Sequence, residues 1–362
     1  MADPRAEVGR ARRVVIKVGS RTLAGGRGVF ERLAAAIAAR EGCSFVVVSS
    51  GAIALGMKKL GYKTRPKEMA RLQAAAAAGQ SLLMRAYEEA FGARGLAVAQ
   101  VLLTHADLAD RTRANNARAA LGALLDAGAV PILNENDSVA VEEIRFGDND
   151  QLAAMVAPLV DADLVVLLSD VEGLLDGSGR RIPVIDDVAR EALPFVRKAS
   201  DAVGTGGMAS KVEAARRATL CGANVVVADA RSPDALEAVL RGEDAGTLFL
   251  AARHRLNAKK YWIAFTLRPR GELVLDRGAA GAVRAKGKSV LSVGVLGVRG
   301  DFGPGDALRL VDTDGNEIAR GLARCTVAQA AAVAGRSRAD LPEELAGLSV
   351  VVHADELVVG MV

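Results

Sequence analysis

The chain alternates short apolar runs with longer segments of helical spacing from residue 14 to residue 250, and this alternation constrains the fold more than any other feature. Strands are expected at 13–18, 45–48, 98–103, 130–133, 163–170 and 224–228, with extended chain at 139–144. Helices are expected at 30–40, 68–91, 115–126, 150–160 and 210–221. Strands that alternate with helices form a mainly parallel sheet sandwiched by helices. The predicted class is therefore α/β.

The pattern changes near residue 255. Residues 252–260 form a polar connector, and from Tyr261 onward short apolar stretches are broken by glycine and by turn sequences. Residues 252–300 contain 11 basic and 2 acidic residues, an excess typical of a separate module. We therefore divide the chain into three parts, namely a basic N-terminal extension without an assigned role at 1–13, an α/β domain at 14–255 and a small β-rich, barrel-like domain at 256–362.

Composition excludes several classes of protein. The three cysteines lie far apart and only three histidines are present, so neither a disulfide framework nor a structural zinc site is expected. We interpret His105 as structural, because no partner stands at metal or triad spacing. No apolar run reaches the roughly 18 to 20 residues of a membrane span, and no secretory signal follows the basic N-terminus. We expect a soluble, cytoplasmic protein without a membrane partner.

Polar clusters follow the predicted strands, at 19–20, 50–51, 134–137 and 169–170. Ligands of open parallel sheets bind beyond the carboxyl ends of the strands, so these clusters mark the expected site. The Ser50 hydroxyl and the N–H groups after it suit a carboxylate, although a helix cap needs the same residues. Ser169 and Asp170 are placed either to touch a nucleotide or to form a turn.

Two lysines lie next to glycine-rich turns. Lys17 ends the first strand just before Gly19, where its ammonium group would meet a phosphate, or would simply be solvated. The segment 204–211, Gly-Thr-Gly-Gly-Met-Ala-Ser-Lys, leads into a helix and predicts an anion cradle at the helix N-terminus. Its spacing is not that of a Walker A loop, and an ordinary surface loop is the alternative.

Between these lysines lie the acidic clusters 134–137 and 147–151. Carboxylates next to a polyphosphate would repel it by about 4 kcal/mol per close charge pair at an effective dielectric near 20. They are therefore expected to hold a cation, which can be a substrate ammonium, the two lysines or Mg²⁺. Asx-rich turns and a helix cap are the structural alternative.

Six short segments, in this order, resemble the amino acid kinase family, and most closely its members that phosphorylate glutamate. They read Val-Ile-Lys-Val-Gly-Ser at 15–20, Val-Ser-Ser-Gly-Ala-Ile-Ala at 48–54, Val-Pro-Ile-Leu-Asn-Glu-Asn-Asp at 130–137, Gly-Asp-Asn-Asp at 147–150, Leu-Leu-Ser-Asp at 167–170 and the cradle at 204–211. Residues 271–276, 278–279, 288–291 and 300–306 resemble the PUA domain that many bacterial members carry. The resemblance covers nearly the whole chain.

The resemblance implies transfer of the γ-phosphoryl group of ATP to the side-chain carboxylate of L-glutamate, which gives L-glutamyl 5-phosphate in the first step of proline biosynthesis. It implies Mg²⁺ bound mainly through the nucleotide phosphates, with no dedicated metal site on the protein. It further implies feedback inhibition by proline, a homo-oligomer (dimer or tetramer), and transfer of the product to glutamyl phosphate reductase. A carboxylate nucleophile is already ionised at neutral pH, which explains why the sequence shows no general base.

Matched by position, the resemblance assigns catalysis to Lys17 and Lys211, which Asp150 would orient. It assigns glutamate binding to Ser50, Gly51, Asn134, Asp137, Asp148 and Asn149. It assigns ATP binding to Lys17, Gly19, Ser169, Asp170, Thr205, Gly206, Gly207, Met208, Ala209, Ser210 and Lys211. The family often has threonine at positions 169 and 210, where serine keeps the hydroxyl group.

Two alternatives stay open at this point. Another kinase of the same fold would act on N-acetylglutamate, aspartate or a nucleoside monophosphate, although the acidic clusters suit a free α-ammonium better than an N-acetyl group. In a different class, the PUA-like domain would make the chain an RNA-binding protein. The basic stretch 252–300 permits RNA binding, but aromatic residues make up only 3% of the chain and argue against base stacking.

Overall fold

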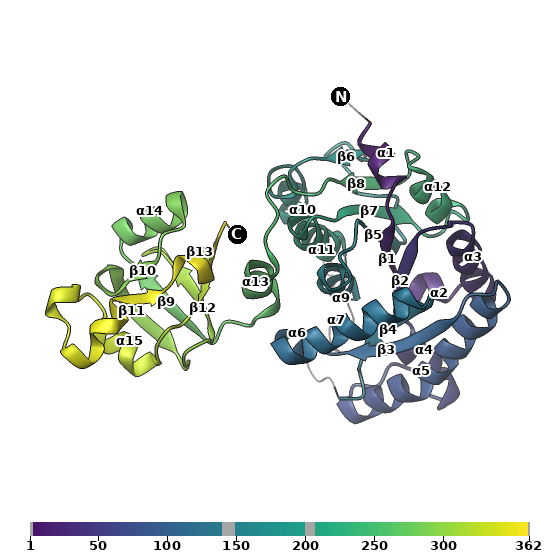
Figure 1. Ribbon diagram of the computed structural model, residues 1–362. Helices are drawn as coiled ribbons and strands as arrows, with labels where there is room; N and C mark the ends of the chain where they lie inside the picture. Colours follow the sequence, from purple (N-terminus) through teal and green to yellow (C-terminus); the bar gives the residue numbers. More distant parts are fainter. Residues whose placement is uncertain (1–2, 140–148, 200–206, 361–362) are drawn as a thin grey trace. The chain divides into compact units, whose positions relative to one another are not determined.

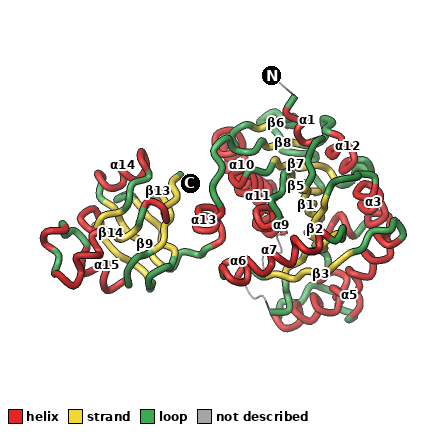
Figure 2. Tube along the Cα trace, viewed as in Figure 1, coloured by secondary structure: helices red, strands yellow, loops and turns green. Residues whose placement is uncertain are grey.

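The computed structural model describes residues 3–139, 149–199 and 207–360. The chain separates into two compact units, Met1–Arg255 and Leu256–Val362, and each is described here by itself (Figures 1 and 2). In neither unit is a described helix both long and apolar enough to cross a membrane.

An eight-stranded sheet forms the centre of the first unit, in the order β3-β4-β2-β1-β5-β7-β8-β6. Its strands are β1 (Arg13–Val18), β2 (Ser44–Ser49), β3 (Val98–Leu103), β4 (Val130–Glu135), β5 (Leu164–Ser169), β6 (Val184–Ile185), β7 (Asn224–Asp229) and β8 (Thr247–Phe249). Within the described chain, neighbouring strands pair in parallel except β7 with β8. The prediction of a mainly parallel sheet is therefore confirmed.

Helices cover both faces of this sheet (Figure 1). The α-helices are α1 (Pro4–Val8), α2 (Ser20–Leu23), α3 (Arg27–Ala38), α4 (Ala52–Lys59), α5 (Met69–Gly92), α6 (His105–Ala109), α7 (Arg111–Asp126), α9 (Asn149–Val156), α10 (Leu193–Ala199), α11 (Met208–Cys221) and α12 (Ala235–Arg241). Shorter helical turns lie at η1 (Ala157–Leu159) and η2 (Val188–Ala192). The extended chain expected at 139–144 falls outside the described residues beyond residue 139.

Alternation along β1 decides where its lysine lies. Val14 and Ile16 pack into the hydrophobic core that includes side chains of α3 and α5, whereas Val15 packs into the core on the other face, with side chains of α9 and α11. Successive strand residues point to opposite faces, so Lys17 shares the face of Val15. The lysine therefore emerges on the side of the sheet that α9 and α11 cover.

Two glycines bring α4 and α5 into backbone contact. A Cβ on Gly56 would lie 1.7 Å from the backbone oxygen of Ala75, and one on Gly79 would lie 1.8 Å from that of Ala52. Any side chain at either position would force the helices apart. This close packing fixes the segment of α5 that contains Gln80, the residue after Gly79.

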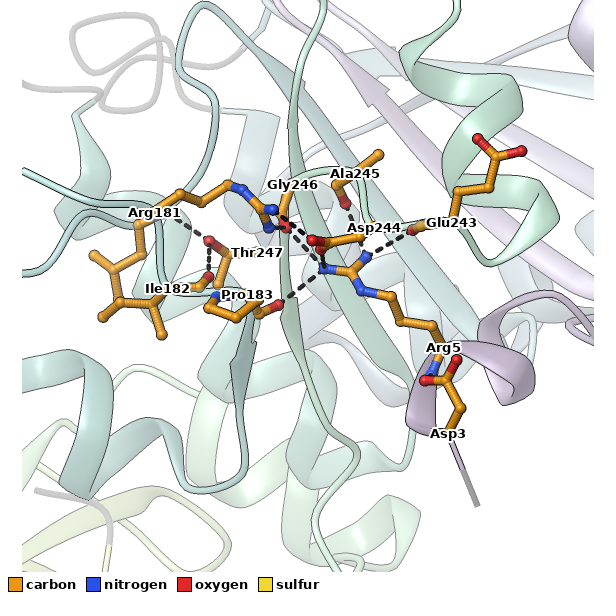
Figure 3. A network of polar contacts seen from close by, with 11 residues as sticks. Asp3, Arg5, Arg181, Ile182, Pro183, Glu243, Asp244, Ala245, Gly246 and Thr247 are labelled. Carbon is orange, nitrogen blue, oxygen red and sulfur yellow. Dashed lines mark hydrogen bonds and ion pairs between the residues drawn. The ribbon is translucent and has the colours of Figure 1, made fainter. Parts of the chain in front are cut away.

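The N-terminal helix α1 is anchored by a buried arginine (Figure 3). The Asp3 side chain caps the helix by accepting a hydrogen bond from the Arg5 backbone N–H at 3.0 Å. The Arg5 guanidinium donates to four backbone carbonyl oxygens at 2.9 to 3.0 Å, those of Pro183, Glu243, Ala245 and Gly246. The extension that received no role from the sequence thus holds the segment that leads into β8.

The second unit contains a five-stranded sheet in the order β11-β9-β12-β13-β15 and a two-stranded sheet of β10 and β14. The strands are β9 (Gly271–Leu275), β10 (Val290–Leu291), β11 (Val295–Gly300), β12 (Ala307–Val311), β13 (Glu317–Leu322), β14 (Val350–Val352) and β15 (Leu357–Val359). Pairing is antiparallel except between β9 and β12. The predicted β-rich class of this domain is confirmed.

Helices are also present in the second unit, where the glycine-broken pattern had predicted mainly strands. They are α13 (Ala258–Tyr261), α14 (Arg277–Lys286) and α15 (Val327–Val333), with shorter turns at η3 (Trp262–Thr266), η4 (Ser292–Gly294), η5 (Arg338–Asp340), η6 (Glu343–Ser349) and η7 (Ala354–Glu356). Side-chain caps explain the longer two, because Asp276 caps α14 and Thr326 forms a capping box with Gln329 at the start of α15.

Candidate functional site

Three charged side chains from distant parts of the sequence meet at the carboxyl edge of the large sheet. The Lys17 ammonium lies 2.5 Å from Oδ1 of Asp150, and the Lys211 ammonium lies 3.0 Å from Oδ2 of the same carboxylate. Lys17 comes from the end of β1, Asp150 from the first turn of α9 and Lys211 from the first turn of α11. The three residues are 7%, 0% and 6% exposed, so the cluster is almost wholly buried.

The cluster carries an excess of positive charge. Burial by itself would raise the pKa of the Asp150 carboxyl, but the Lys17 and Lys211 ammonium groups outweigh it and hold that pKa below its ordinary value. Asp150 is therefore ionised at neutral pH, and two ammonium groups with one carboxylate sum to a charge of +1. A second anion at this place would be held by both lysines, which are already positioned by Asp150.

Side-chain amides continue from this cluster along the ends of the strands. The Asn149 amide nitrogen donates to the Ser49 carbonyl oxygen at 2.6 Å and to Oδ1 of Asn134 at 2.9 Å, and it lies 3.2 Å from the Ser50 hydroxyl. Asn134 and Asn149 are buried, whereas Ser50 is half-buried. The structure thus brings together three of the predicted glutamate-binding residues.

Two further predicted residues border the same place. Gly51 precedes α4 with φ of +100°, a left-handed conformation that glycine adopts without strain. Asp137 follows β4 and lines a small pocket together with Ala52, Gln80 and Glu135. Asp148, which the sequence places in the same group, lies outside the described residues.

The predicted nucleotide residues lie on the other side of Lys17. A Cβ on Gly19 would stand 3.8 Å from the Lys17 ammonium, so the Gly19 backbone is next to that charge. At the end of β5, Ser169 is buried and donates to Asp170 at 3.2 Å. The Arg21 guanidinium donates to Asp170 at 2.6 Å, and this hydrogen bond is the main reason why the pKa of Asp170 lies below its ordinary value.

Of the expected anion cradle at 204–211, the structure describes residues 207–211. Gly207 precedes α11, and Met208, Ala209 and Ser210 form the first turn of the helix before Lys211. The Gln151 side chain on α9 donates to the Ser210 carbonyl oxygen at 3.1 Å, which ties α9 to α11 beside the lysine. Thr205 and Gly206 lie outside the described residues.

A cavity of about 220 Å³ lies beyond the end of β7. Its lining includes Glu172, Asp229 and Arg181 together with Ala245 and Gly246. Asp229 pairs in register with Ser169 of β5, so the cavity adjoins the strand end that carries Ser169 and Asp170. Acidic groups in this lining accept hydrogen bonds from neutral hydroxyl or amino groups, whereas they would repel a phosphate.

The described residues do not form a cage for a divalent cation. No group of three or more histidine, cysteine, aspartate or glutamate side chains gathers among them in a way that could hold a metal ion. Both oxygens of Asp150, the most central carboxylate, are engaged by lysines. Mg²⁺ prefers oxygen ligands, and the two oxygens of Asp150 are already paired with ammonium groups.

Sequence reasoning missed three polar side chains at the site. Arg21 pairs with Asp170, Gln151 supports the start of α11, and Gln80 accepts a hydrogen bond from Asn134 Nδ2 at 2.9 Å. Gln80 carried a signal in the sequence, because it is an amide beside alanine, glycine and leucine on a helix face expected to be apolar, a face that it shares with Gln73. Arg21 and Gln151 look like ordinary surface residues until the fold brings their partners close.

Comparisons with known proteins agree with this arrangement. The model of the amino acid kinase family matches residues 12–229, and that of the PUA domain matches residues 271–345. A protein of Myxococcus xanthus named glutamate 5-kinase is 47% identical, with 96% of each chain covered. Proteins of the same name from Moorella thermoacetica (44% identical, 98% of each chain) and Thermus thermophilus (47% identical, 96% of this chain and 97% of the relative) are also similar.

Proposed function

Since the chain belongs to the amino acid kinase family, and within it to the glutamate 5-kinases, we propose that Lys17, Asp150 and Lys211 form its phosphoryl-transfer centre. The enzyme transfers the γ-phosphoryl group of ATP to the side-chain carboxylate of L-glutamate and gives L-glutamyl 5-phosphate, the first step of proline biosynthesis. The observation that carries the proposal is the pair of buried ammonium groups sharing one carboxylate at the carboxyl edge of the sheet.

In this proposal a carboxylate oxygen of glutamate attacks the γ-phosphorus, and the bond to the oxygen that bridges the β- and γ-phosphates breaks. ADP leaves with the bonding electrons. The loose transition state needs little covalent help, so catalysis consists of alignment and of positive charge near the phosphoryl oxygens. Lys17 and Lys211 supply that charge, and Asp150 orients both ammonium groups without accepting a proton.

Glutamate lies between this centre and the pocket of Asp137. The Ser50 hydroxyl and the N–H groups at Gly51 hold its reacting end. Asn149 donates to the Ser49 carbonyl and to Asn134, and its nitrogen lies 3.2 Å from the Ser50 hydroxyl, which it positions. Asp137 and Asp148 accept the α-ammonium group. A free ammonium satisfies these carboxylates, whereas an N-acetylated substrate would leave them unpaired.

ATP binds on the side of Ser169. Its phosphates lie against Gly19, Lys17 and the segment 205–211, namely Thr205, Gly206, Gly207, Met208, Ala209, Ser210 and Lys211. Ser169 and Asp170 contact the nucleotide, and its base and ribose lie towards the cavity of about 220 Å³, whose acidic lining suits their hydroxyl and amino groups. Mg²⁺ would enter bound to the nucleotide phosphates, as the resemblance to the family implies.

The remaining proposals concern regulation and assembly. We expect proline to inhibit the enzyme, copies of the chain to form a dimer or tetramer, and the labile acyl phosphate to pass to glutamyl phosphate reductase. The cytoplasm is the proposed compartment. RNA binding by the PUA domain is not favoured, because aromatic residues make up only 3% of the chain and offer few stacking surfaces.

The test uses the purified full-length chain with ATP and Mg²⁺. ADP release and hydroxylamine trapping are measured with L-glutamate, N-acetylglutamate and L-aspartate, because only acyl phosphates form hydroxamates. We expect rapid product formation with glutamate alone, and a lower rate when proline is added. Hydroxamate formed solely with another acid would overturn the assignment of glutamate.

A further inference from the structure

The substrate pocket contains a buried amide donor that the site described so far does not use. Gln80 on α5 is 9% exposed, and its Nε2 atom has no hydrogen-bond partner among the described residues. An unsatisfied buried donor costs about 1 to 3 kcal/mol, and such groups are rare in folded proteins. Because this unpaired N–H group lies next to the proposed substrate pocket, we expect its hydrogen-bond acceptor to be an atom of the bound ligand.

The orientation of this amide is fixed by its neighbours. The side-chain nitrogen of Asn149 lies 2.6 Å from the backbone oxygen of Ser49, and a carbonyl oxygen only accepts hydrogen bonds. The atom of Asn149 at this position must therefore be nitrogen. The same nitrogen lies 2.9 Å from Oδ1 of Asn134, which also accepts the Glu135 backbone N–H at 2.9 Å.

Two backbone groups thus determine the direction of the whole series. With its oxygen fixed by the Glu135 N–H, Asn134 presents Nδ2 to Gln80, and the Gln80 oxygen accepts it at 2.9 Å. Gln80 must then turn its own nitrogen the other way. Flipping any one amide would place two donors or two acceptors face to face, so the end of the series that has no partner in the described chain, Gln80 Nε2, is a donor.

This donor belongs to the lining of a narrow pocket. Ala52, Ala76 and Leu102 form its apolar wall, and residues 135–138, with the carboxylates of Glu135 and Asp137, form the rest. The pocket has room for about 10 Å³, close to the space that one water molecule or one carboxylate oxygen needs. An amide donor beside two carboxylates is complementary to a carboxylate that stands next to an ammonium.

We propose that Gln80 is a specificity-determining residue, which donates a hydrogen bond from Nε2 to the α-carboxylate of the amino-acid substrate while Asp137 in the same pocket holds its α-ammonium. This inference rests on the proposed function, since it places the α end of glutamate in the pocket and the reacting carboxylate at the lysines. The amide series then runs from Asn149, beside Ser50 at the reacting end of the substrate, through Asn134 to Gln80 at the α end. One connected set of side chains therefore positions the groups that contact both ends.

The key variant is Gln80→Glu in the full-length chain. It keeps an oxygen for Asn134 Nδ2 but replaces the donor by a negatively charged acceptor. Gln80→Leu removes the donor without adding charge, and Gln100→Glu adds the same charge at an exposed position of β3 as a control. Rates of hydroxamate formation are measured with L-glutamate and with 4-aminobutyrate, which is glutamate without the α-carboxylate.

We expect kcat/KM for glutamate to fall by about 10- to 100-fold in Gln80→Glu, mainly through KM, because a charge-assisted hydrogen bond made in both ground and transition state is lost. The KM for ATP should change less than about twofold. Since 4-aminobutyrate cannot use the donor, the preference for glutamate over it should fall by the same 10- to 100-fold. Gln80→Leu should show the same loss of preference, and Gln100→Glu none.

Equal losses for both substrates would overturn the inference, because they would indicate a merely structural role. An unchanged preference in both Gln80 variants would also overturn it and would show that the donor binds only water. If the wild-type enzyme formed no hydroxamate from glutamate, the proposed function would fail instead. Calorimetric titration of glutamate into wild type and Gln80→Glu would then still decide whether Gln80 contributes to binding.

Discussion

Two clusters in the first unit contain the same charges but differ in where the carboxylate lies. In each, two basic side chains share one aspartate, namely Lys17 and Lys211 with Asp150, and Arg5 and Arg181 with Asp244. The Asp150 side chain is 0% exposed, whereas that of Asp244 is 62% exposed. In the lysine cluster the carboxylate is the buried centre, but in the arginine cluster it lies at the rim.

The difference lies in how the donors are used. The guanidinium of Arg5 is a planar fork, and its hydrogen bonds go to four carbonyl oxygens that the fold itself supplies (Figure 3). The lysine ammonium groups are compact charges that both face one carboxylate, so a further anion can approach them. Charge count alone therefore does not separate the arginine cluster, which anchors a helix, from the proposed phosphoryl-transfer centre, whereas the identity of the acceptors does.

The largest effect should come from removing either lysine. We expect Lys17→Ala and Lys211→Ala each to lower kcat by about 10²- to 10³-fold, because each loses one of the charges that stabilise the phosphoryl group in transit. The free energy of unfolding should fall by less than the activation free energy of the reaction rises, because the remaining lysine still pairs with Asp150. ADP release and thermal unfolding measure the two effects, and unchanged turnover in both variants would refute the assignment.

A smaller effect, on stability instead of turnover, is expected at Arg5. Arg5→Ala leaves four carbonyl oxygens without their donor, and we expect the free energy of unfolding to fall by about 2 to 3 kcal/mol. The kcat of the folded enzyme at saturating substrate should stay within about twofold. Denaturant titration alongside the activity assay measures both quantities.

Arg5→Lys is the matched control for this variant. It keeps the positive charge but loses the planar fork, so it should restore less than half of the lost stability. Full restoration by lysine would mean that charge, and not the set of carbonyl hydrogen bonds, holds helix α1. In that case the contrast between the two clusters would disappear.

The same contrast explains what the sequence could predict. Alternation of apolar and helical segments predicted the sheet, and strand ends predicted where Lys17, Ser50, Asn134 and Ser169 would lie, because these signals are local. Arg5 could not be interpreted, since its partners are backbone carbonyls near residues 183 and 243–246 that only the fold brings together. Backbone acceptors leave no trace in residue identity.

Gln80 shows the limit within the site itself. The sequence marks it as a polar residue on a mostly apolar helix face, but its role depends on which of its two amide atoms faces the pocket. That choice is made by the Ser49 carbonyl and the Glu135 N–H, two backbone groups on neighbouring strands. Resemblance to a family indicates which residues belong to the site, but it does not indicate which atom of an amide donates and which accepts.

The smallest effect is expected at Asp244. Its carboxylate is 62% exposed, and exposed ion pairs contribute about 0 to 1 kcal/mol. Asp244→Asn should therefore cost less than about 1 kcal/mol of unfolding free energy and leave kcat unchanged, while Arg5 keeps its four carbonyl acceptors. A loss as large as that of Arg5→Ala, measured in the same denaturant titration, would show that the ion pairs dominate this cluster.

The pH dependence of Asp244→Asn sharpens this prediction. A hydrogen bond from Arg181 is the main cause that holds the pKa of Asp244 below its ordinary value of 3.8. Such a group contributes stability that is fully present above 3.8 and is lost as the pH falls through the lower pKa of the folded state. The variant should therefore match wild type more closely below pH 3 than at pH 7. If the difference in unfolding free energy between wild type and Asp244→Asn instead grew in acid, the depressed pKa of Asp244 would be contradicted. The view that Asp244 is an exposed and weakly coupled charge, beside an Arg5 guanidinium whose hydrogen bonds go to backbone carbonyls, would then fail as well.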